Sequence, residues 1–234
     1  MTADRLARSV RRQLGLGRVL PLGGPGDTVW VTERAAAGVL RAAAEAVPGI
    51  RLGALRIGAA KGPDGAEGES AGAAGAPPGS APGSAPAGAL PRRPLRVEAG
   101  FEATADHPLP ESAGRLRDAL WEAAVESVGL EPEAIDLTVT GLLEEGGPRP
   151  ACPEEDADPP EEGRRTTTAG RAAAAVPGVA GLTSRLGGQR HPSQVQIAVG
   201  TGHRALDVGR AVAAAVTAVT QDATTVVVTD IAGG

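Results

Sequence analysis

The chain has 234 residues, a formal net charge of −5, 34 glycines, 20 prolines and one cysteine. The negative charge and the near absence of aromatic side chains disfavour nucleic-acid binding, because phosphate neutralisation needs a basic face and single strands stack on aromatic rings. One cysteine excludes an intramolecular disulfide, and no apolar run approaches the ~20 residues of a membrane-spanning helix. We therefore expect a cytoplasmic protein of bacterial composition, with no transmembrane segment and with small cores of Val, Leu, Ile and Ala.

Residues 1–22 predict a basic amphipathic arm. Leu6, Val10 and Leu14 fall on one helical stripe, and arginines surround it. Such an arm either docks on an acidic partner or an anionic lipid surface, or packs on its own domain. The arm therefore leaves open membrane association through lipid or through a protein partner.

A first module is predicted over residues 27–145. Val29 to Val31 indicate a brief strand, and Thr32 is a good N-cap for a helix that runs to Val47. A strand follows over residues 51–57. Residues 59–94 are rich in Gly, Ala, Pro and Ser, so they can bury too little apolar surface to offset their ordering entropy. We interpret them as a disordered insertion in a hairpin.

The rest of this module has clear periodicity. Residues 95–101 alternate apolar and polar side chains, as expected of a half-buried strand. Pro110 begins a helix whose apolar positions run to Val128, and residues 134–142 form a closing strand. The first module is thus predicted as helix, strand, strand, helix, strand.

The same order is predicted a second time over residues 166–232, after an acidic, proline-rich linker at 146–165. Ala46-Val47-Pro48-Gly49-Ile50 in the first copy corresponds to Ala175-Val176-Pro177-Gly178-Val179 in the second. Strands at 179–186, 195–199 and 225–231 and a helix at 206–219 complete the repeat. The expected fold class is α+β: two small α-β-β-α-β modules with mixed sheets, joined by disordered linkers.

The sharpest local motif is Gly200-Thr201-Gly202-His203-Arg204-Ala205, between a strand and a helix. It matches a dinucleotide fingerprint, whose glycines let a pyrophosphate approach backbone amides, so Gly200, Gly202 and Ala205 are the candidate cofactor-binding residues. Asp222 and Asp230 are candidate ribose ligands. Against this interpretation, a single crossover unit builds no crevice, and the matching turn at 101–108 has no such glycines.

No catalytic or metal site is predicted. His107, His191 and His203 are scattered, without Cys or carboxylate partners at metal-ligand spacing. Asp106 and His107 lie near Ser112, but nothing supplies a nucleophile turn or an oxyanion site. Cys152 lies among acidic residues, which disfavour the thiolate. We expect no cofactor, no metal and no enzymatic activity.

The strongest resemblance is to the alkaline shock protein family of envelope stress proteins. It is carried by Val31-Thr32-Glu33-Arg34-Ala35 at the head of an alanine-rich helix, Val47-Pro48-Gly49-Ile50 at its end, Leu95 to Ala99, Leu116 to Val128, and Ile135 to Gly141. The resemblance covers residues 29–142 well and 166–232 more weakly. It implies a small cytoplasmic α+β module without known enzymatic activity, often held at the membrane by a separate anchor protein. It transfers no functional residues.

Two functions follow from these patterns. The leading hypothesis is a non-enzymatic, envelope-stress-associated scaffold or interaction protein that docks to a membrane anchor protein and self-associates through exposed edge strands, Leu95 to Phe101 among them. The alternative is a small nucleotide-binding regulatory protein that uses the turn from Gly200 to Ala205.

Overall fold

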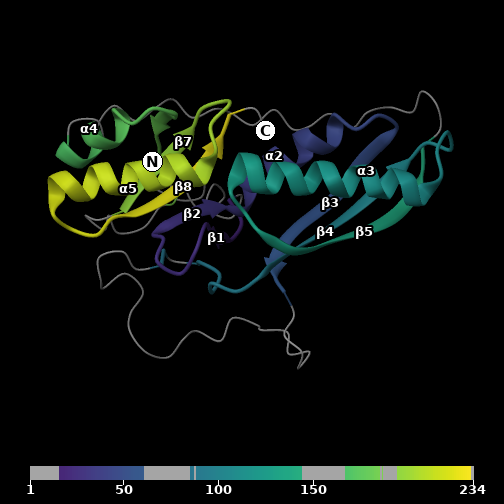
Figure 1. The fold of residues 1–234 in the computed structure, drawn as a ribbon, viewed down its shortest axis with the longest axis horizontal. Helices are drawn as coiled ribbons and strands as arrows, with labels where there is room; N and C mark the ends of the chain where they lie inside the picture. Colours follow the sequence, from purple (N-terminus) through teal and green to yellow (C-terminus); the bar gives the residue numbers. More distant parts are fainter. Residues whose placement is uncertain are drawn as a thin grey trace, which may run out of the picture.

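The computed structural model describes residues 16–60, 85–86, 88–143, 167–184, 186 and 194–232. The first module consists of α2 (Glu33–Glu45), β3 (Ile50–Ala59), β4 (Leu95–Ala103), α3 (Leu109–Glu122), the π-helical turn η1 (Ala123–Val128) and β5 (Pro132–Leu142). The second consists of α4 (Thr168–Ala174), β6 (Val179–Leu182), β7 (Gln194–Val199), α5 (Ala205–Thr220) and β8 (Thr225–Ile231). Figure 1 shows the two modules side by side along the long axis.

The two modules share one sheet topology. In the first, β3 pairs antiparallel with β4, and β4 pairs parallel with β5 across the helical crossover. In the second, β6 pairs antiparallel with β7, and β7 pairs parallel with β8. This confirms the α+β class and the duplicated α-β-β-α-β order.

Local sequence explains the limits of α2. The hydroxyl of Thr32 accepts a hydrogen bond from the amide of Ala35 and so caps the helix. Ala36 and Leu40 are fully buried one turn apart. Pro48 follows the helix, and Gly49 adopts φ +74°, a conformation that glycine enters without steric cost.

An N-terminal hairpin completes the sheet of the second module. It consists of β1 (Val19–Pro21) and β2 (Val29–Thr32), and the sheet order is β1-β2-β8-β7-β6, with β2 parallel to β8. The predicted strand at 29–31 is therefore confirmed, but it extends the sheet of the other module. The order of the elements along the chain does not predict this pairing, because β2 and β8 lie about 200 residues apart in sequence.

The prediction of an arm over residues 1–22 is wrong for its last seven residues. Leu16, Val19, Leu20 and Leu22 are at most 1% exposed and belong to the hairpin and its approach. The helical stripe ends at Leu14, and a three-residue strand is too short to show a period that would separate it from the arm. The remaining arm residues, 1–15, lie outside the described residues.

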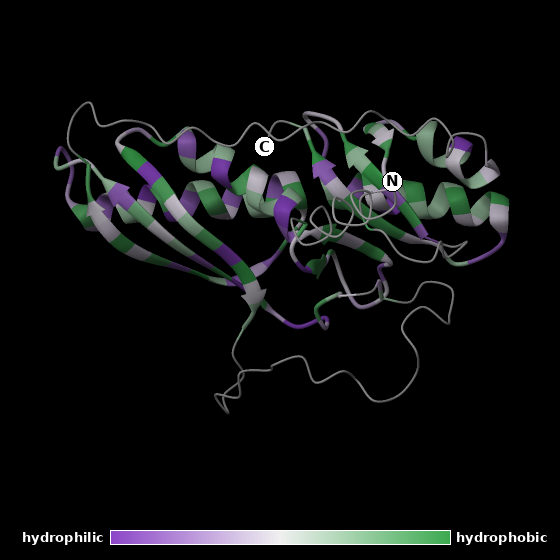
Figure 2. Cartoon of the chain, turned by 180° about the vertical axis from the view of Figure 1, so that it is seen from behind, coloured by the Kyte–Doolittle hydropathy of each residue, from purple (hydrophilic) through white to green (hydrophobic). Residues whose placement is uncertain are grey.

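One apolar core joins both modules. It includes Leu120 and Phe101 of the first module and Val212 and Val228 of the second in a single cluster. Helix α2 lies at the centre, against β3, β8 and η1 (Figure 1). Figure 2 shows hydrophobic and hydrophilic residues alternating along strands of the sheets. The modules are therefore repeats of topology that fold as one packed body.

Two further expectations need correction. Leu95 to Phe101 is not an edge, since β4 lies between β3 and β5. The end of the predicted insertion, residues 88–94, packs on the hairpin, where Leu90 donates its amide to the carbonyl of Val19. Residues 61–84 of the insertion and the linker at 146–165 lie outside the described residues. Among the helices that the structure describes, none is long and apolar enough to cross a membrane.

Candidate functional site

The glycine-rich turn lies where the sequence predicts it, between the end of β7 and the start of α5. Gly200 follows the last residue of β7, and Gly202 adopts φ +74°. Thr201, Gly202 and His203 are exposed, whereas Ala205, the first residue of α5, is fully buried. The three candidate residues therefore share one turn but differ in access.

The sheet behind this turn has a feature that the sequence did not show. β2, β8 and β7 are adjacent parallel strands, so three strands end at the same edge, where one crossover unit was expected. Open parallel sheets bind ligands beyond the carboxyl ends of their strands. The sheet therefore has the adjacent parallel strands that a nucleotide site needs. Whether a nucleotide can bind then depends on what already occupies the carboxyl-terminal edge of these strands.

The two candidate ribose ligands lie at opposite ends of β8. Asp222 is in the turn that precedes β8, away from the glycines, and so cannot act with them. Asp230 pairs in register with Ala198 near the carboxyl end of β7, at the same edge as the turn. Of the two acids, only Asp230 lies at the edge of the sheet where a dinucleotide-binding site would need an acidic residue.

Residues of the first module contact the amino end of α5. The side chain of Arg204 donates from Nε to the carbonyl oxygen of Val125 in η1 at 2.9 Å. Gly129, which ends η1, packs against Leu206, and Leu206 is 4% exposed. The carboxyl end of η1 thus meets the amino end of α5, an arrangement that complements both helix dipoles.

The amide of Gly200 is also engaged, because it donates to the carbonyl of Gly178 at 2.8 Å. A phosphate at this turn would have to compete with that hydrogen bond and with the contacts of η1. The geometry therefore gives the turn a packing role: it holds α5 against both its own module and its neighbour.

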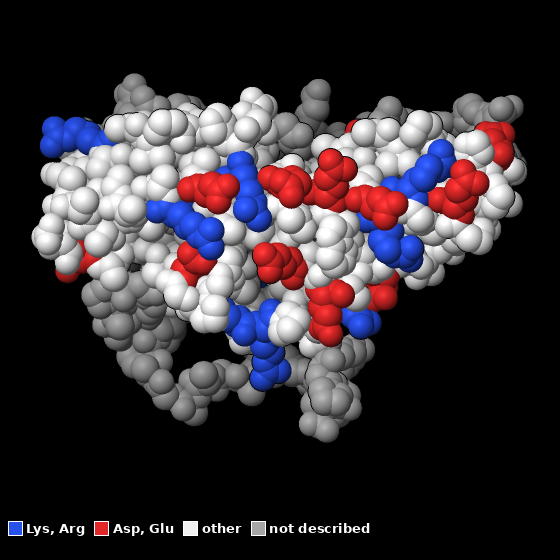
Figure 3. Space-filling model, viewed as in Figure 1, with Lys and Arg blue, Asp and Glu red and all other residues white. Residues whose placement is uncertain are grey.

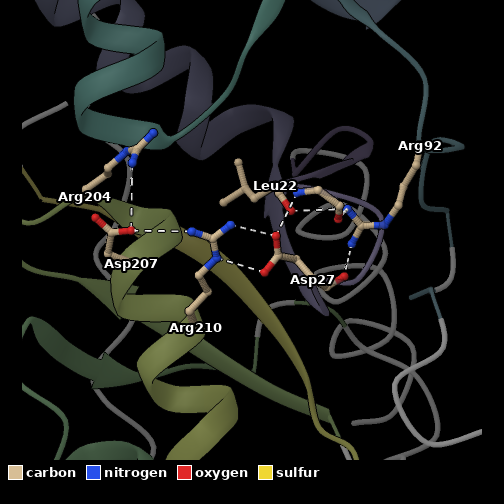
Figure 4. A network of polar contacts seen from close by, with 7 residues as sticks. Leu22, Asp27, Arg92, Arg204, Asp207 and Arg210 are labelled. Carbon is tan, nitrogen blue, oxygen red and sulfur yellow. Dashed lines mark hydrogen bonds and ion pairs between the residues drawn. The ribbon is translucent and has the colours of Figure 1, made fainter.

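A polar network fixes the N-terminal hairpin to α5 (Figure 4). Asp27, in the hairpin loop, accepts two hydrogen bonds at 2.8 Å from Nε and Nη2 of Arg210. The Arg210 hydrogen bond, together with the Gly24 amide and the positive charges of Arg210 and Arg92, lowers the pKa of Asp27 below its ordinary value of 3.8 against the opposing effect of burial. The pair is a bidentate clamp between the first strands and the last helix.

Arg92 holds the other side of the same loop. Its Nη1 donates to the carbonyls of Leu22 and Gly24 at 3.2 and 2.9 Å, its Nη2 donates to the carbonyl of Asp27, and its guanidinium lies 4.7 Å from the ring centre of Trp30. Burial lowers the pKa of Arg92, and the nearby Asp27 charge opposes that shift. All these partners belong to the N-terminal hairpin, so Arg92 stabilises the hairpin.

A pocket of about 230 Å³ lies beside Arg92. Glycine and proline residues of the hairpin loop, the segment from Arg92 to Leu95, Gly129 and Glu131 line it. The guanidinium of Arg92 faces backbone carbonyls, and Arg93 and Glu131 have opposite charges. The charged residues of the lining are two arginines and one glutamate, and Arg92 already donates to backbone carbonyls, so the pocket selects no one class of ligand by its charge.

The scattered polar residues form no reactive cluster within the part of the chain that the structure describes. His203 is exposed and its Nδ1 lies 3.0 Å from the carbonyl oxygen of Thr201, while His107 and Asp106 are exposed and Ser112 is buried in α3. Among the described residues, no group of three or more His, Cys, Asp or Glu side chains is placed to hold a metal. Cys152 and His191 lie outside the described residues.

Acidic and basic side chains are mixed on the face drawn in Figure 3, and neither sign covers it. Comparison of the chain with family models, with curated proteins and with solved structures found no match. The function must therefore be argued from the fold and from its surfaces.

Proposed function

We propose that the protein is a non-enzymatic scaffold or interaction protein of the envelope-stress type, which docks to a membrane anchor protein. The observation that carries this proposal is the duplicated α-β-β-α-β module. It is the element order that the resemblance to alkaline shock proteins implies, and it places long strands at the outside of the first sheet.

The placement of polar groups supports the same conclusion. The charged residues with the most extensive contacts, Asp27, Arg92 and Arg210, bind each other or backbone carbonyls of the hairpin. The turn with the strongest ligand motif is packed against η1. These groups stabilise the assembly of two modules, so the outer surface is the part of the molecule left to meet a partner.

The test is an affinity capture of the full chain from membrane and cytosolic fractions, compared with a chain that lacks residues 2–15. The deletion stops before Leu16, because Leu16, Leu20 and Leu22 are buried and their loss would unfold the hairpin. A second variant replaces Arg11 and Arg12 by Glu and keeps the length unchanged. Specific recovery of a membrane protein supports the proposal, and its loss in both variants assigns the docking to the arm.

The nucleotide-binding alternative has a separate test. A dinucleotide at millimolar concentration should leave the melting temperature unchanged, because the amide of Gly200 and the start of α5 are already engaged. A rise in melting temperature that Gly202→Val abolishes would favour the alternative over the scaffold.

A further inference from the structure

The two sheets have four outer strands among the described residues, and three of these are protected against further pairing. β1 has three residues, includes Pro21, and is covered by residues 88–90. β6 has four residues. β3 has a break in register between Leu52 and Leu55 and carries Arg51 and Arg56. Short length, proline, irregularity and charge are the usual means by which sheet edges avoid association.

The fourth outer strand, β5, lacks most of this protection. It has 11 residues, and although its pairing with β4 shifts register near both ends, the stretch from Ala134 to Val139 pairs without a break. Residues 137–143 carry no charge and no proline, and Val139 and Leu142 are 41% and 63% exposed. Figure 1 shows β5 as the outer strand of its sheet. Such an edge is a template for another strand.

The direction of the backbone groups follows from one hydrogen bond. The carbonyl oxygen of Ile135 accepts from Nε of the Arg117 side chain at 3.3 Å, so we infer that it points away from β4, whose amides bond the carbonyls that face them. Alternate residues of a strand direct their backbone groups to the same side, so Leu137 and Val139 also present theirs outward. The described residues supply no partner strand for this row, and unpaired backbone groups favour the addition of one.

The internal repeat shows what occupies this edge in the second module. β8 is the counterpart of β5, since each closes its module and pairs parallel with the preceding strand. The outer edge of β8 is covered by β2, with Trp30 opposite Val227. The closing strand of the module therefore accepts a further strand where the chain provides one.

We propose that β5 pairs antiparallel with β5 of a second copy of this chain, with the two-fold axis at Thr138, so that two three-stranded sheets become one of six strands. In this register Thr138 faces Thr138 of the partner subunit, and Leu137 and Val139 face each other across the axis. Cross-strand pairs of threonine and of apolar side chains stabilise a sheet. In this register the unbroken stretch from Ala134 to Val139 of each copy faces residues 137–142 of the other, and Asp136 forms an ion pair with Arg96 at 3.0 Å.

Composition favours a second copy over another segment of the same chain. Residues 1–15 are rich in arginine, residues 61–84 in Gly, Ala, Pro and Ser, and residues 144–166 in acids and proline. None of these stretches contains a run of β-branched residues, whereas β5 has Thr138, Val139 and Thr140 in succession. β5 is therefore the best strand available to pair with β5.

The test measures the molar mass of the full chain in solution by sedimentation velocity. The molar mass measured for the wild type should be twice the 23.2 kDa of one chain. Val139→Lys should sediment as a monomer with an unchanged circular dichroism spectrum, because the exposed side chain tolerates the change, whereas in the dimer each lysine would face Leu137 of the partner subunit and lie diagonal to the other lysine. The matched control, Ala54→Lys, alters an exposed position of the other outer strand and should remain dimeric.

A cross-link tests the register. Thr138→Cys in a Cys152→Ser background should form a disulfide-linked dimer on mild oxidation, since facing residues of a non-hydrogen-bonded pair lie within disulfide reach. Ala54→Cys in the same background should not. A monomeric wild type, or a dimer that survives Val139→Lys and does not cross-link through position 138, would overturn the proposal. These outcomes are independent of whether a membrane protein is captured, so the two proposals fail separately.

Discussion

Gly129 and Leu206 are in direct contact at the junction of the two modules. A Cβ atom at Gly129 would overlap the Cβ of Leu206 and lie 3.1 Å from its Cδ2. Gly129 also has φ +87°, a conformation that residues with side chains rarely adopt. The continuous helical stretch of α3 and η1 therefore ends at a residue that must be glycine for two separate reasons.

Gly129→Ala should lower the free energy of unfolding by about 3 kcal/mol, from backbone strain and from overpacking against Leu206. Gly202→Ala is the matched control, because Gly202 has φ +74° and no atom lies within 4 Å of the place that a Cβ would take there. It should cost about 1 kcal/mol from strain alone. Urea unfolding measures both, and equal losses would show that the junction relaxes without cost.

Thr32→Ala should destabilise the protein more than Thr167→Ala, although both residues cap the first helix of their module. Thr32 is fully buried, caps the amide of Ala35 and donates to the carbonyl of Thr229 in β8. Thr167 caps Gly170 from an exposed position on a seven-residue helix. Expected losses are about 2 and about 0.5 kcal/mol by thermal unfolding. A larger loss at Thr167 would contradict the central position of α2.

Asp27→Asn should lower stability at neutral pH by less than about 1 kcal/mol, since Arg210 is half exposed and solvent screens the pair. The folded-state pKa of Asp27 is lowered, so the stabilisation is present above its ordinary value of 3.8 and disappears as pH falls through the folded pKa. Wild type and variant should therefore converge in strong acid. Asp118→Asn, the same change at an exposed position of α3, should leave the free energy of unfolding at neutral pH unchanged.

Cleavage of the linker should leave the two modules bound to each other. A protease site placed within residues 146–165 separates the chain into two fragments, but β2 pairs with β8 and α2 packs on β8. The fragments should co-elute in size-exclusion chromatography and separate in denaturant. Fragments that separate under native conditions would show that the common core contributes little.

Local signals determined the elements of this fold. The alternation of Leu95 to Phe101, the N-cap at Thr32 and the end of the second helical stretch at Val128 all lie where the sequence places them, because each depends on neighbours a few residues away. The repeat of helix, strand, strand, helix, strand was visible for the same reason. The turn from Gly200 to Ala205 was also correctly placed between a strand and a helix.

What surrounds those elements depended on contacts between distant parts of the chain. The pairing of β2 with β8, the central position of β4 and the contact of Arg204 with Val125 follow no local period, because each minimises exposed backbone or apolar surface over the whole molecule. The sequence by itself therefore determined a duplicated α+β module. Only the tertiary structure decided that the modules share one core, that the glycine turn is a junction, and that β5 is the edge left open among the described strands.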